Sequence, residues 1–451
     1  MIGVSLSRWT MSYFAAALLA LVAAEIMMAM GYGFPSAALR APETLILVHV
    51  VAIGWLSLLM CGALFQFVPV LVAQPLYSNT LPLPTLLFLL AGFAMLVLGF
   101  LQLAGDIDPS TPFFALASAL LGLGFALVLW NLARTLSAAL TVPLPARFVV
   151  VGLVGVAATA ALGIIFALVF GGTTSYGPFA LLMEKGLPLH VVAGLGGWLT
   201  FTAIGVSYRL LAMFMLAPEL DRTSTKAALS LGAAALGVAV LGGTAAILLG
   251  VEVELVLLAA GVPGLASLAL YGGDVLHLYR TRKRRNIELN SRMAMLALAS
   301  LAASVVLTVV LLAFGRLSEH VGAVVFLTAF GWLSGLGLAQ LYKIVAFLTW
   351  LECYGPVLGK MQTPRVQDLV VEARALKWFW LYFLAVWSGT ILLVAGYAFA
   401  FQAIAALMLV ATGGIITELV RTRLLANVKA VAQLQAGIRK PRLLFSLSHQ
   451  T

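Results

Sequence analysis

Long apolar runs without charge restrict the fold of this chain more than any other feature. The run from residue 44 to residue 72 contains no Asp, Glu, Lys or Arg, although it carries one histidine. A helix of roughly 20 apolar residues is long enough to cross the hydrocarbon core of a membrane. Twelve such runs predict an all-α, polytopic membrane protein, because only helices and closed barrels satisfy their backbone hydrogen bonds in lipid. The expected spans are about 11–31, 44–72, 83–104, 112–134, 148–170, 188–216, 227–250, 253–279, 292–314, 320–350, 376–398 and 401–420.

Composition argues against a water-soluble protein. Hydrophobic residues make up 63% of the 451 residues, charged residues make up only 9%, and the mean hydropathy is +1.10. Soluble globular domains carry far more charge than this. The net charge of +10 fits loops that face anionic lipid, so we expect the lipid bilayer, and not nucleic acid, as the partner of the basic residues.

Basic residues divide unequally between the two expected sides of the membrane. The N-terminus, the even-numbered connections and the C-terminus carry 21 of the 26 Lys and Arg residues, and the odd-numbered connections carry three. By the positive-inside rule, both termini are predicted to be cytoplasmic, in a bacterial inner membrane. Residues 1–420 would form the transmembrane domain, and residues 421–451 a basic cytoplasmic tail that lies along the membrane surface.

Three of the spans share a Gly-Trp motif. Gly-Trp-Leu is followed by Ser or Thr at residues 54–57, 197–200 and 331–334. An aromatic residue and then a polar or basic one follow each motif at the same distance: Phe65-Gln66, Tyr208-Arg209 and Tyr342-Lys343. The copies lie four spans apart, which predicts three pseudo-repeated four-helix units at about 1–140, 141–285 and 286–420. Alternatively, the glycines only mark close contacts between helices.

Each of these spans also has a histidine near its expected outer end. His49, His190 and His320 are therefore candidate cofactor-binding residues, and His190 and His320 are also candidate metal ligands, because neutral imidazole binds iron and copper. The alternative is that they are hydrogen-bonded residues that fix helix packing. Glu25 lies at a similar depth in the first span and would either orient the His49 ring or carry protons. A neutral glutamate bonded to the backbone is the other interpretation.

Charged residues near the expected cytoplasmic ends of the spans have a simpler interpretation. Arg209 and Lys343 are predicted to extend their long side chains toward the headgroups, and Asp274 and Glu418 are interpreted in the same way. Roles as pathway charges, or as partners of cofactor propionates, remain open for Arg209 and Lys343.

The three histidine-bearing helices resemble the catalytic subunit of haem–copper oxidases. The segments GWLSLLMCGALFQFVPVL and GWLSGLGLAQLYKIVAFL look like helix 10 of the C-family oxidases and bacterial nitric-oxide reductases, and LHVVAGLGGWLTFTAIG looks like helix 6. The likeness extends to the NnrS family of haem- and copper-containing membrane proteins. The resemblance implies that His49 is an axial ligand of haem b and that His190 is a ligand of copper.

Several ligand positions of that superfamily are not histidine in this chain. The seventh span, expected at 227–250, contains no histidine, and the two haem-ligand positions of helix 10 are Val324 and Phe326. His320 lies more than a helical turn further out. We therefore predict that the chain is not a complete haem–copper oxygen reductase by itself, and its status as an enzyme is open.

Two hypotheses of function follow. The first is a haem-binding integral membrane protein related to oxidase subunit I, in electron transfer or in nitric-oxide or respiratory physiology, with another membrane subunit or a cytochrome as candidate partner. The second is a cofactor-free transporter or assembly factor on the same fold, in which the histidines and Glu25 form a polar site.

Overall fold

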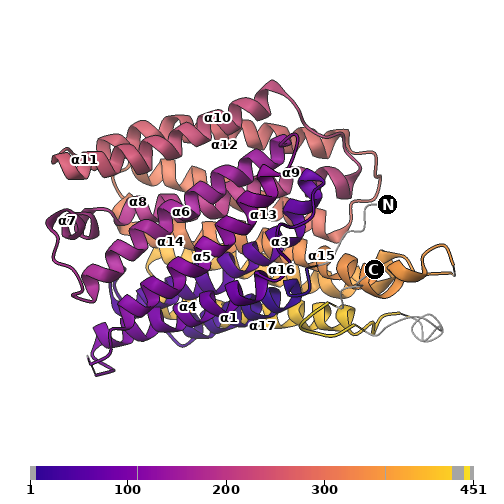
Figure 1. The fold of residues 1–451 in the computed structure, drawn as a ribbon, viewed down its shortest axis with the longest axis horizontal. Helices are drawn as coiled ribbons and strands as arrows, with labels where there is room; N and C mark the ends of the chain where they lie inside the picture. The colour runs from indigo at the N-terminus through magenta and orange to yellow at the C-terminus, as the bar shows by residue number, and fades with distance from the viewer. Residues whose placement is uncertain (1–6, 109, 361, 429–440, 447–451) are drawn as a thin grey trace. The chain divides into compact units, whose positions relative to one another are not determined.

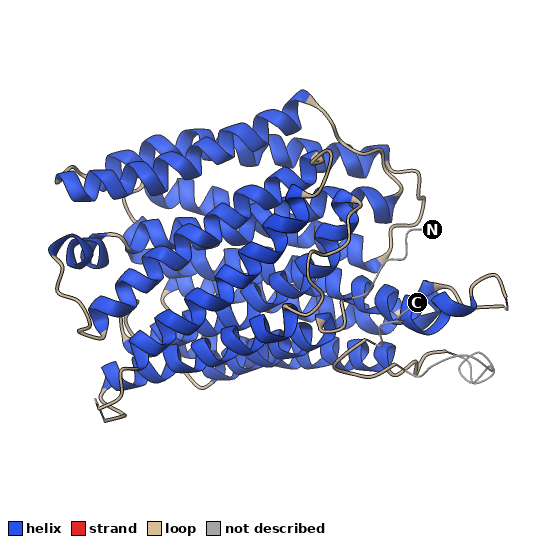
Figure 2. Ribbon diagram, in the orientation of Figure 1, coloured by secondary structure: helices blue, strands red, loops and turns tan. Residues whose placement is uncertain are grey.

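The fold of the chain is described from a computed structural model, which covers residues 7–108, 110–360, 362–428 and 441–446. Within these ranges every regular element is a helix and no strand occurs, as Figures 1 and 2 show. The predicted all-α class is confirmed. Most of the predicted tail falls on residues 429–440 and 447–451, which lie outside the described residues.

Twelve helices in the described chain are long and apolar enough to cross a membrane, as the sequence predicts. Eight of them are uninterrupted α-helices. The other four are composite helices that contain a π-helical segment, which is long in three of them and short in the fourth. The uninterrupted helices are α1 (Thr10–Ala29), α4 (Pro82–Ala104), α5 (Phe113–Ser137), α6 (Leu144–Phe170), α12 (Val253–Thr281), α13 (Leu289–Ala313), α16 (Glu372–Ala395) and α17 (Ala398–Arg423). The composite ones are α2–η1–α3 (Pro42–His49, Val50–Ser57, Leu58–Val72), α8–η2–α9 (Leu187–Val191, Val192–Phe201, Thr202–Met215), α10–η3–α11 (Thr223–Gly237, Val238–Gly242, Gly243–Leu249) and α14–η4–α15 (Leu317–Phe326, Leu327–Ser334, Gly335–Tyr354).

Local sequence accounts for many of the helix ends. Proline stands in the first two positions of α2, α4, α6 and α8, where its missing N–H has no intrahelical partner to lose. After α16, Gly396 adopts a left-handed conformation (φ 79°), which a residue with a side chain would adopt only with strain. These signals place the helix boundaries close to those expected from the apolar runs.

One helix was not expected from the sequence. Between α6 and α8 the chain forms α7 (Gly177–Lys185), a helix of nine residues. Its residue Leu182 is buried in an apolar cluster with Leu189 and Ile247. Alone it is too short to form a stable helix, so its stability depends on this packing, which hydropathy along the chain does not reveal.

The three copies of the Gly-Trp motif lie in π-helical segments. Residues 54–57 fall within η1, residues 197–200 within η2 and residues 331–334 within η4. In η1 and η4 the motif serine donates a hydrogen bond of 2.7 Å to the carbonyl five residues earlier, from Ser57 to Ala52 and from Ser334 to Ala329. Wide turns of this kind inside α-helices are often found at functional sites.

The described chain forms two compact units. The first consists of Met1–Gln66 and Ile287–Thr451, and the second of Phe67–Asn286. The division into three four-helix units stays a prediction.

In the first unit, α1 packs against η1 and α17, and η4 packs against α13 and α16. The two ends of the chain meet here, because the backbone N–H of Ser446 donates to the carbonyl of Arg8 (2.9 Å) and Phe445 lies against Trp9. In the second unit, α6 packs along η2 and α9, α4 pairs with α5, and α10 pairs with α12.

The spans that carry the motif are the most buried ones in the described chain. In an apolar stretch of 18 residues within each of these spans 61–72% of the residues are buried, against 11–44% in the other nine spans. Small residues bring neighbouring helices close to them. A Cβ at Gly197 would lie 3.2 Å from Cα of Gly155 in α6, and one at Gly331 would lie 2.8 Å from Cβ of Ser300 in α13. The motif glycines Gly197 and Gly331 therefore mark close helix contacts.

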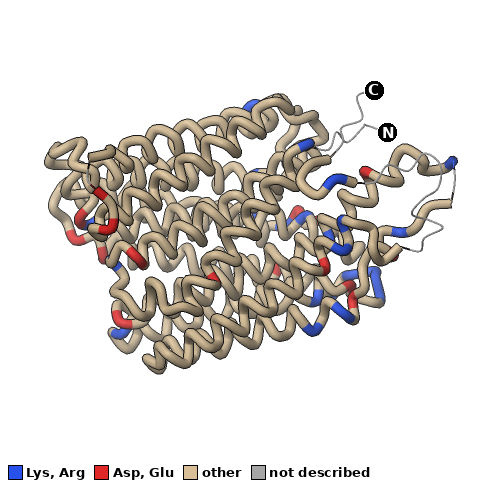
Figure 3. The backbone as a smooth tube through the Cα atoms, turned by 90° about the horizontal axis from the view of Figure 1, so that it is seen from below, with Lys and Arg blue, Asp and Glu red and all other residues tan. Residues whose placement is uncertain are grey.

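Charged residues gather at helix ends and leave the middle of the helices largely uncharged, as Figure 3 shows. This distribution is the one expected of helices that cross lipid, where a charge near the bilayer centre is costly. Glu25 is a clear exception, because it lies inside α1 and its side chain is fully buried.

Candidate functional site

Glu25 is the central residue of the candidate site. It lies on α1, about 6 Å along the helix axis from the end at Ala29. Its oxygen Oε1 accepts a hydrogen bond of 2.8 Å from the hydroxyl of Thr412 on α17. Its second oxygen, Oε2, has no hydrogen-bond partner in the described part of the chain. A buried polar atom without a partner costs free energy, which is why such atoms are rare unless they have a role.

Further buried polar groups lie in the same unit. Tyr382 on α16 donates a hydrogen bond of 2.9 Å to the carbonyl of Phe330 in η4. The same hydroxyl lies beside Ser334 and within electrostatic range of Glu25. Trp55 in η1 donates to the hydroxyl of Ser334 (2.7 Å). The first and third copies of the motif are thus joined directly by their own side chains.

Together these residues form what we call the central polar cluster: Glu25, Trp55, Ser334, Tyr382 and Thr412. Each comes from a different helix of the first unit, and each side chain has an exposed fraction of 0%. The neighbourhood is otherwise apolar. The carboxyl group is therefore stable there either in its protonated, neutral form or, when ionised, with a cation or water beside it. The chemistry that this cluster can perform is therefore to hold a proton on the carboxyl group of Glu25 and to release it.

The three candidate histidines lie in different surroundings. His49 ends α2, and its Nδ1 lies 2.7 Å from the carbonyl of Leu45 one turn earlier. His320, also in the first unit, lies 3.8 Å from the carboxylate of Glu319. His190 belongs to the second unit, where its ring packs against Phe166 with centroids 5.5 Å apart. The hydrogen bond of Glu25 goes to Thr412 and not to His49.

No group of three or more His, Cys, Asp or Glu side chains in the described ranges is placed to hold a metal ion. A haem iron takes only one or two protein ligands, so this finding bears on copper and other ions held by several side chains, not on haem. For His49, the contact with the Leu45 carbonyl places the ring proton on Nδ1 and makes Nε2 the basic nitrogen that would bind iron.

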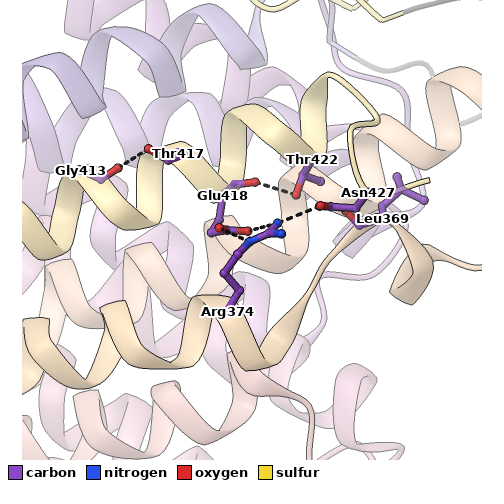
Figure 4. A network of polar contacts seen from close by, with 7 residues as sticks. All are labelled: Leu369, Arg374, Gly413, Thr417, Glu418, Thr422 and Asn427. Carbon is purple, nitrogen blue, oxygen red and sulfur yellow. Dashed lines mark hydrogen bonds and ion pairs between the residues drawn. The ribbon is translucent and has the colours of Figure 1, made fainter. Parts of the chain in front are cut away.

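The expectation that Lys343 and Glu418 extend toward the headgroups is wrong. Lys343 lies 2.6 Å from Glu288, and its side chain is only 15% exposed. Glu418 on α17 receives two hydrogen bonds from Arg374 on α16, of 2.5 and 2.7 Å. Figure 4 shows Arg374 between Glu418 and Asn427, which in turn donates to the carbonyl of Leu369. These charges are buried in pairs because an opposite charge is within reach, which a single sequence does not show.

In the second unit, Asp274 on α12 is also buried and does not extend toward the headgroups. Its carboxylate accepts hydrogen bonds from Ser224 (2.7 Å), Thr225 (2.6 Å) and Tyr208 (3.1 Å). Tyr208 is the aromatic residue that follows the second copy of the motif. With both oxygens bonded, Asp274 joins α9, α10 and α12, and we interpret it as a structural residue. Arg209 differs from these groups, since it pairs with the exposed Glu219. Its side chain is itself partly exposed, as expected for a residue near the surface.

Sequence reasoning identified part of the cluster. Glu25 was a candidate because carboxylates inside apolar runs are rare, and Trp55 and Ser334 belong to the repeated motif. Thr412 and Tyr382 were missed, because a single threonine or tyrosine in an apolar span is unremarkable in a sequence. Thr412 lies in the polar and small stretch Ala411–Gly414 of α17, which was the available signal.

Comparison with known proteins adds no relative. No protein-family model matches the chain, and no curated protein matches its sequence.

Proposed function

We propose that this chain is a proton-translocating membrane transporter in which Glu25 takes up and releases the proton. The observation that carries the proposal is the fully buried carboxylate, with one oxygen bonded to Thr412 and the other without a hydrogen-bond partner among the described residues. A carboxylate at this depth in a membrane protein is usually functional, because keeping it there without a use is costly. The hydroxyl of Tyr382, which lies within electrostatic range of Glu25, is the candidate group for passing the proton on.

Proton flux into liposomes tests this proposal. The full chain is reconstituted with a pH-sensitive dye inside, and a membrane potential, negative inside, is imposed with potassium and valinomycin. We expect acidification faster than in empty liposomes, and we expect Glu25→Gln to abolish the excess, because an amide cannot exchange this proton. Glu43→Gln, at the start of α2, is the control and should keep the flux. Flux equal to that of empty liposomes, or full flux in Glu25→Gln, would overturn the proposal.

A second candidate function is haem b binding at His49, in electron transfer or in nitric-oxide or respiratory physiology. It rests on the resemblance to oxidase subunit I and is favoured by the contact of His49 Nδ1 with the Leu45 carbonyl, which orients Nε2 as a ligand. Copper at His190 or His320 is the less supported extension of this candidate. Another membrane subunit or a cytochrome would be the electron partner.

Absorption spectroscopy distinguishes the two candidates. A haem protein purified from haem-replete cells shows a Soret band that His49→Ala removes or shifts. His277→Ala, near the C-terminal end of α12, is the control and leaves the band unchanged. A colourless preparation removes the haem candidate and leaves the transporter proposal standing.

We further propose a bacterial inner membrane as the location, with both termini in the cytoplasm. The split of basic residues between the two predicted sides supports this orientation. It places Glu25 nearer the outer face, so a proton from outside would have the shorter path to the carboxylate.

A further inference from the structure

The second unit contains an open pocket with a volume of about 450 Å³ at the end of α9. Two cationic side chains, Arg209 and Lys283, line it together with the carboxylate of Glu219. The rest of the lining is apolar and comes from Ala212, Met213, Leu216 and Ala217. The lining therefore combines two cationic side chains and one carboxylate with a larger apolar part.

Backbone contacts hold the two sides of the pocket together. The N–H of Lys283 donates to the carbonyl of Leu216 (3.4 Å), and that of Arg284 donates to Met215 (3.3 Å). Leu216 has a left-handed conformation (φ 53°), which ends α9 and turns the chain toward Glu219. The pocket thus lies between the end of α9 and the basic segment at the end of α12.

The charge of the pocket suits an anion. Lys283 lies in the segment 280–285, which contains five Lys or Arg residues, and the single carboxylate belongs to Glu219. The side chain of Glu219 is 74% exposed and that of Arg209 is 32% exposed. An ion pair this exposed contributes little stability, so an incoming anion can replace Glu219 at Arg209.

The apolar part of the pocket distinguishes an anion that carries apolar groups from one that does not. Met213 and Leu216 remain 46% and 55% exposed beside the cations. Inorganic phosphate would make no use of these side chains, whereas a phospholipid would place its glycerol and the first part of its acyl chains against them. Basic pockets at the ends of membrane helices are known to suit anionic headgroups.

We infer that this pocket binds the phosphate headgroup of an anionic phospholipid through Arg209 and Lys283. Glu219 acts as an internal competitor that occupies Arg209 when no lipid is bound. The inference does not depend on Glu25 or on haem, because every residue of the pocket belongs to the second unit, whereas the residues of the central polar cluster belong to the first.

Native mass spectrometry of the full chain in neutral detergent tests the inference. Short-chain phosphatidylglycerol is titrated, with phosphatidylcholine of the same chain length and inorganic phosphate as separate arms. We expect phosphatidylglycerol to bind, and we expect Arg209→Gln and Lys283→Gln each to weaken it about fivefold. Glu219→Gln should tighten binding, because the competing carboxylate is gone. Lys226→Gln, which removes an exposed cation paired with Asp221 on the same unit, is the control and should have no effect.

Three results would overturn the inference. Equal binding of phosphatidylcholine would show that charge is not recognised. Equal binding of inorganic phosphate would assign the pocket to a free anion and not to a lipid. Unchanged phosphatidylglycerol binding in the Arg209→Gln, Lys283→Gln double variant would place the lipid elsewhere on the protein.

Discussion

Glu25 on the first span and Thr412 on the last span are joined by a hydrogen bond of 2.8 Å, although 387 positions separate them along the chain. Both side chains are fully buried. The bond satisfies one oxygen of the carboxylate and joins α1 to α17, the first and the last of the membrane-spanning helices.

Replacing Thr412 by valine should destabilise the protein by about 1–3 kcal/mol, because it leaves a buried carboxylate oxygen without its partner at nearly constant volume. Thr417→Val is a matched control on the same helix. The Thr417 hydroxyl is exposed and donates only within α17, to the carbonyl of Gly413. Thermal unfolding of the two variants in the same detergent measures the difference. Equal stability would show that the bond between Thr412 and Glu25 is not formed.

Glu25 should react with dicyclohexylcarbodiimide, an apolar reagent that enters the membrane and adds to protonated carboxyl groups without releasing a fragment. Peptide mapping by mass spectrometry should find the adduct on the first span, and Glu25→Gln should remove it. Glu254 at the start of α12 is an exposed carboxylate and should remain unmodified by comparison. Absence of any adduct on Glu25 would mean that the carboxyl is inaccessible and would count against proton translocation.

Ser334→Ala should destabilise the first unit by about 1–3 kcal/mol, because the buried indole N–H of Trp55 then loses its acceptor. Thr328→Val, in the same π-helical segment, removes a hydroxyl that donates to Val324 of its own helix and should have the smaller effect. Unfolding followed by tryptophan fluorescence reports the two changes. A larger effect of Thr328→Val would argue that the motif serine does not join η1 to η4.

Removing one partner of the ion pair between Arg423 and Glu352 should cost about 3–5 kcal/mol, since an unpaired buried charge remains. The two side chains are 3% and 1% exposed and lie 2.6 Å apart. The pair between Arg365 and Asp368 is the control, because its side chains are 79% and 43% exposed. Arg365→Gln should change stability by less than about 1 kcal/mol. Similar losses from Arg423→Gln and Arg365→Gln would contradict the buried pair.

Orientation in the membrane can be measured with reporters. A fluorescent protein fused after Thr451 should be bright, whereas alkaline phosphatase at the same position should be inactive, because the basic residues predict a cytoplasmic C-terminus. A phosphatase fusion in the connection between α6 and α8 should be active. The reverse pattern would invert the orientation and move Glu25 toward the cytoplasmic face.

The candidate site could be predicted only in part. Glu25 was identifiable because a carboxylate inside an apolar run needs a compensating partner, and Trp55 and Ser334 were marked by the repeated motif. Their partners were not identifiable. Thr412 and Tyr382 look like ordinary residues of apolar spans, and the burial of Lys343 and Glu418 depends on Glu288 and Arg374, which lie far from them in sequence.

Sequence alone determined the twelve spans and the helical class, because crossing a membrane depends on the length of an apolar run, and this is a local property. The tertiary structure decided which helices are inside each unit, where the π-helical segments fall and which polar side chains meet. Lipid is as apolar as a leucine side chain, so hydropathy does not tell which face of a span points inward. Contacts such as that of Glu25 with Thr412 are set by close packing between distant helices, and only the folded chain brings these residues together.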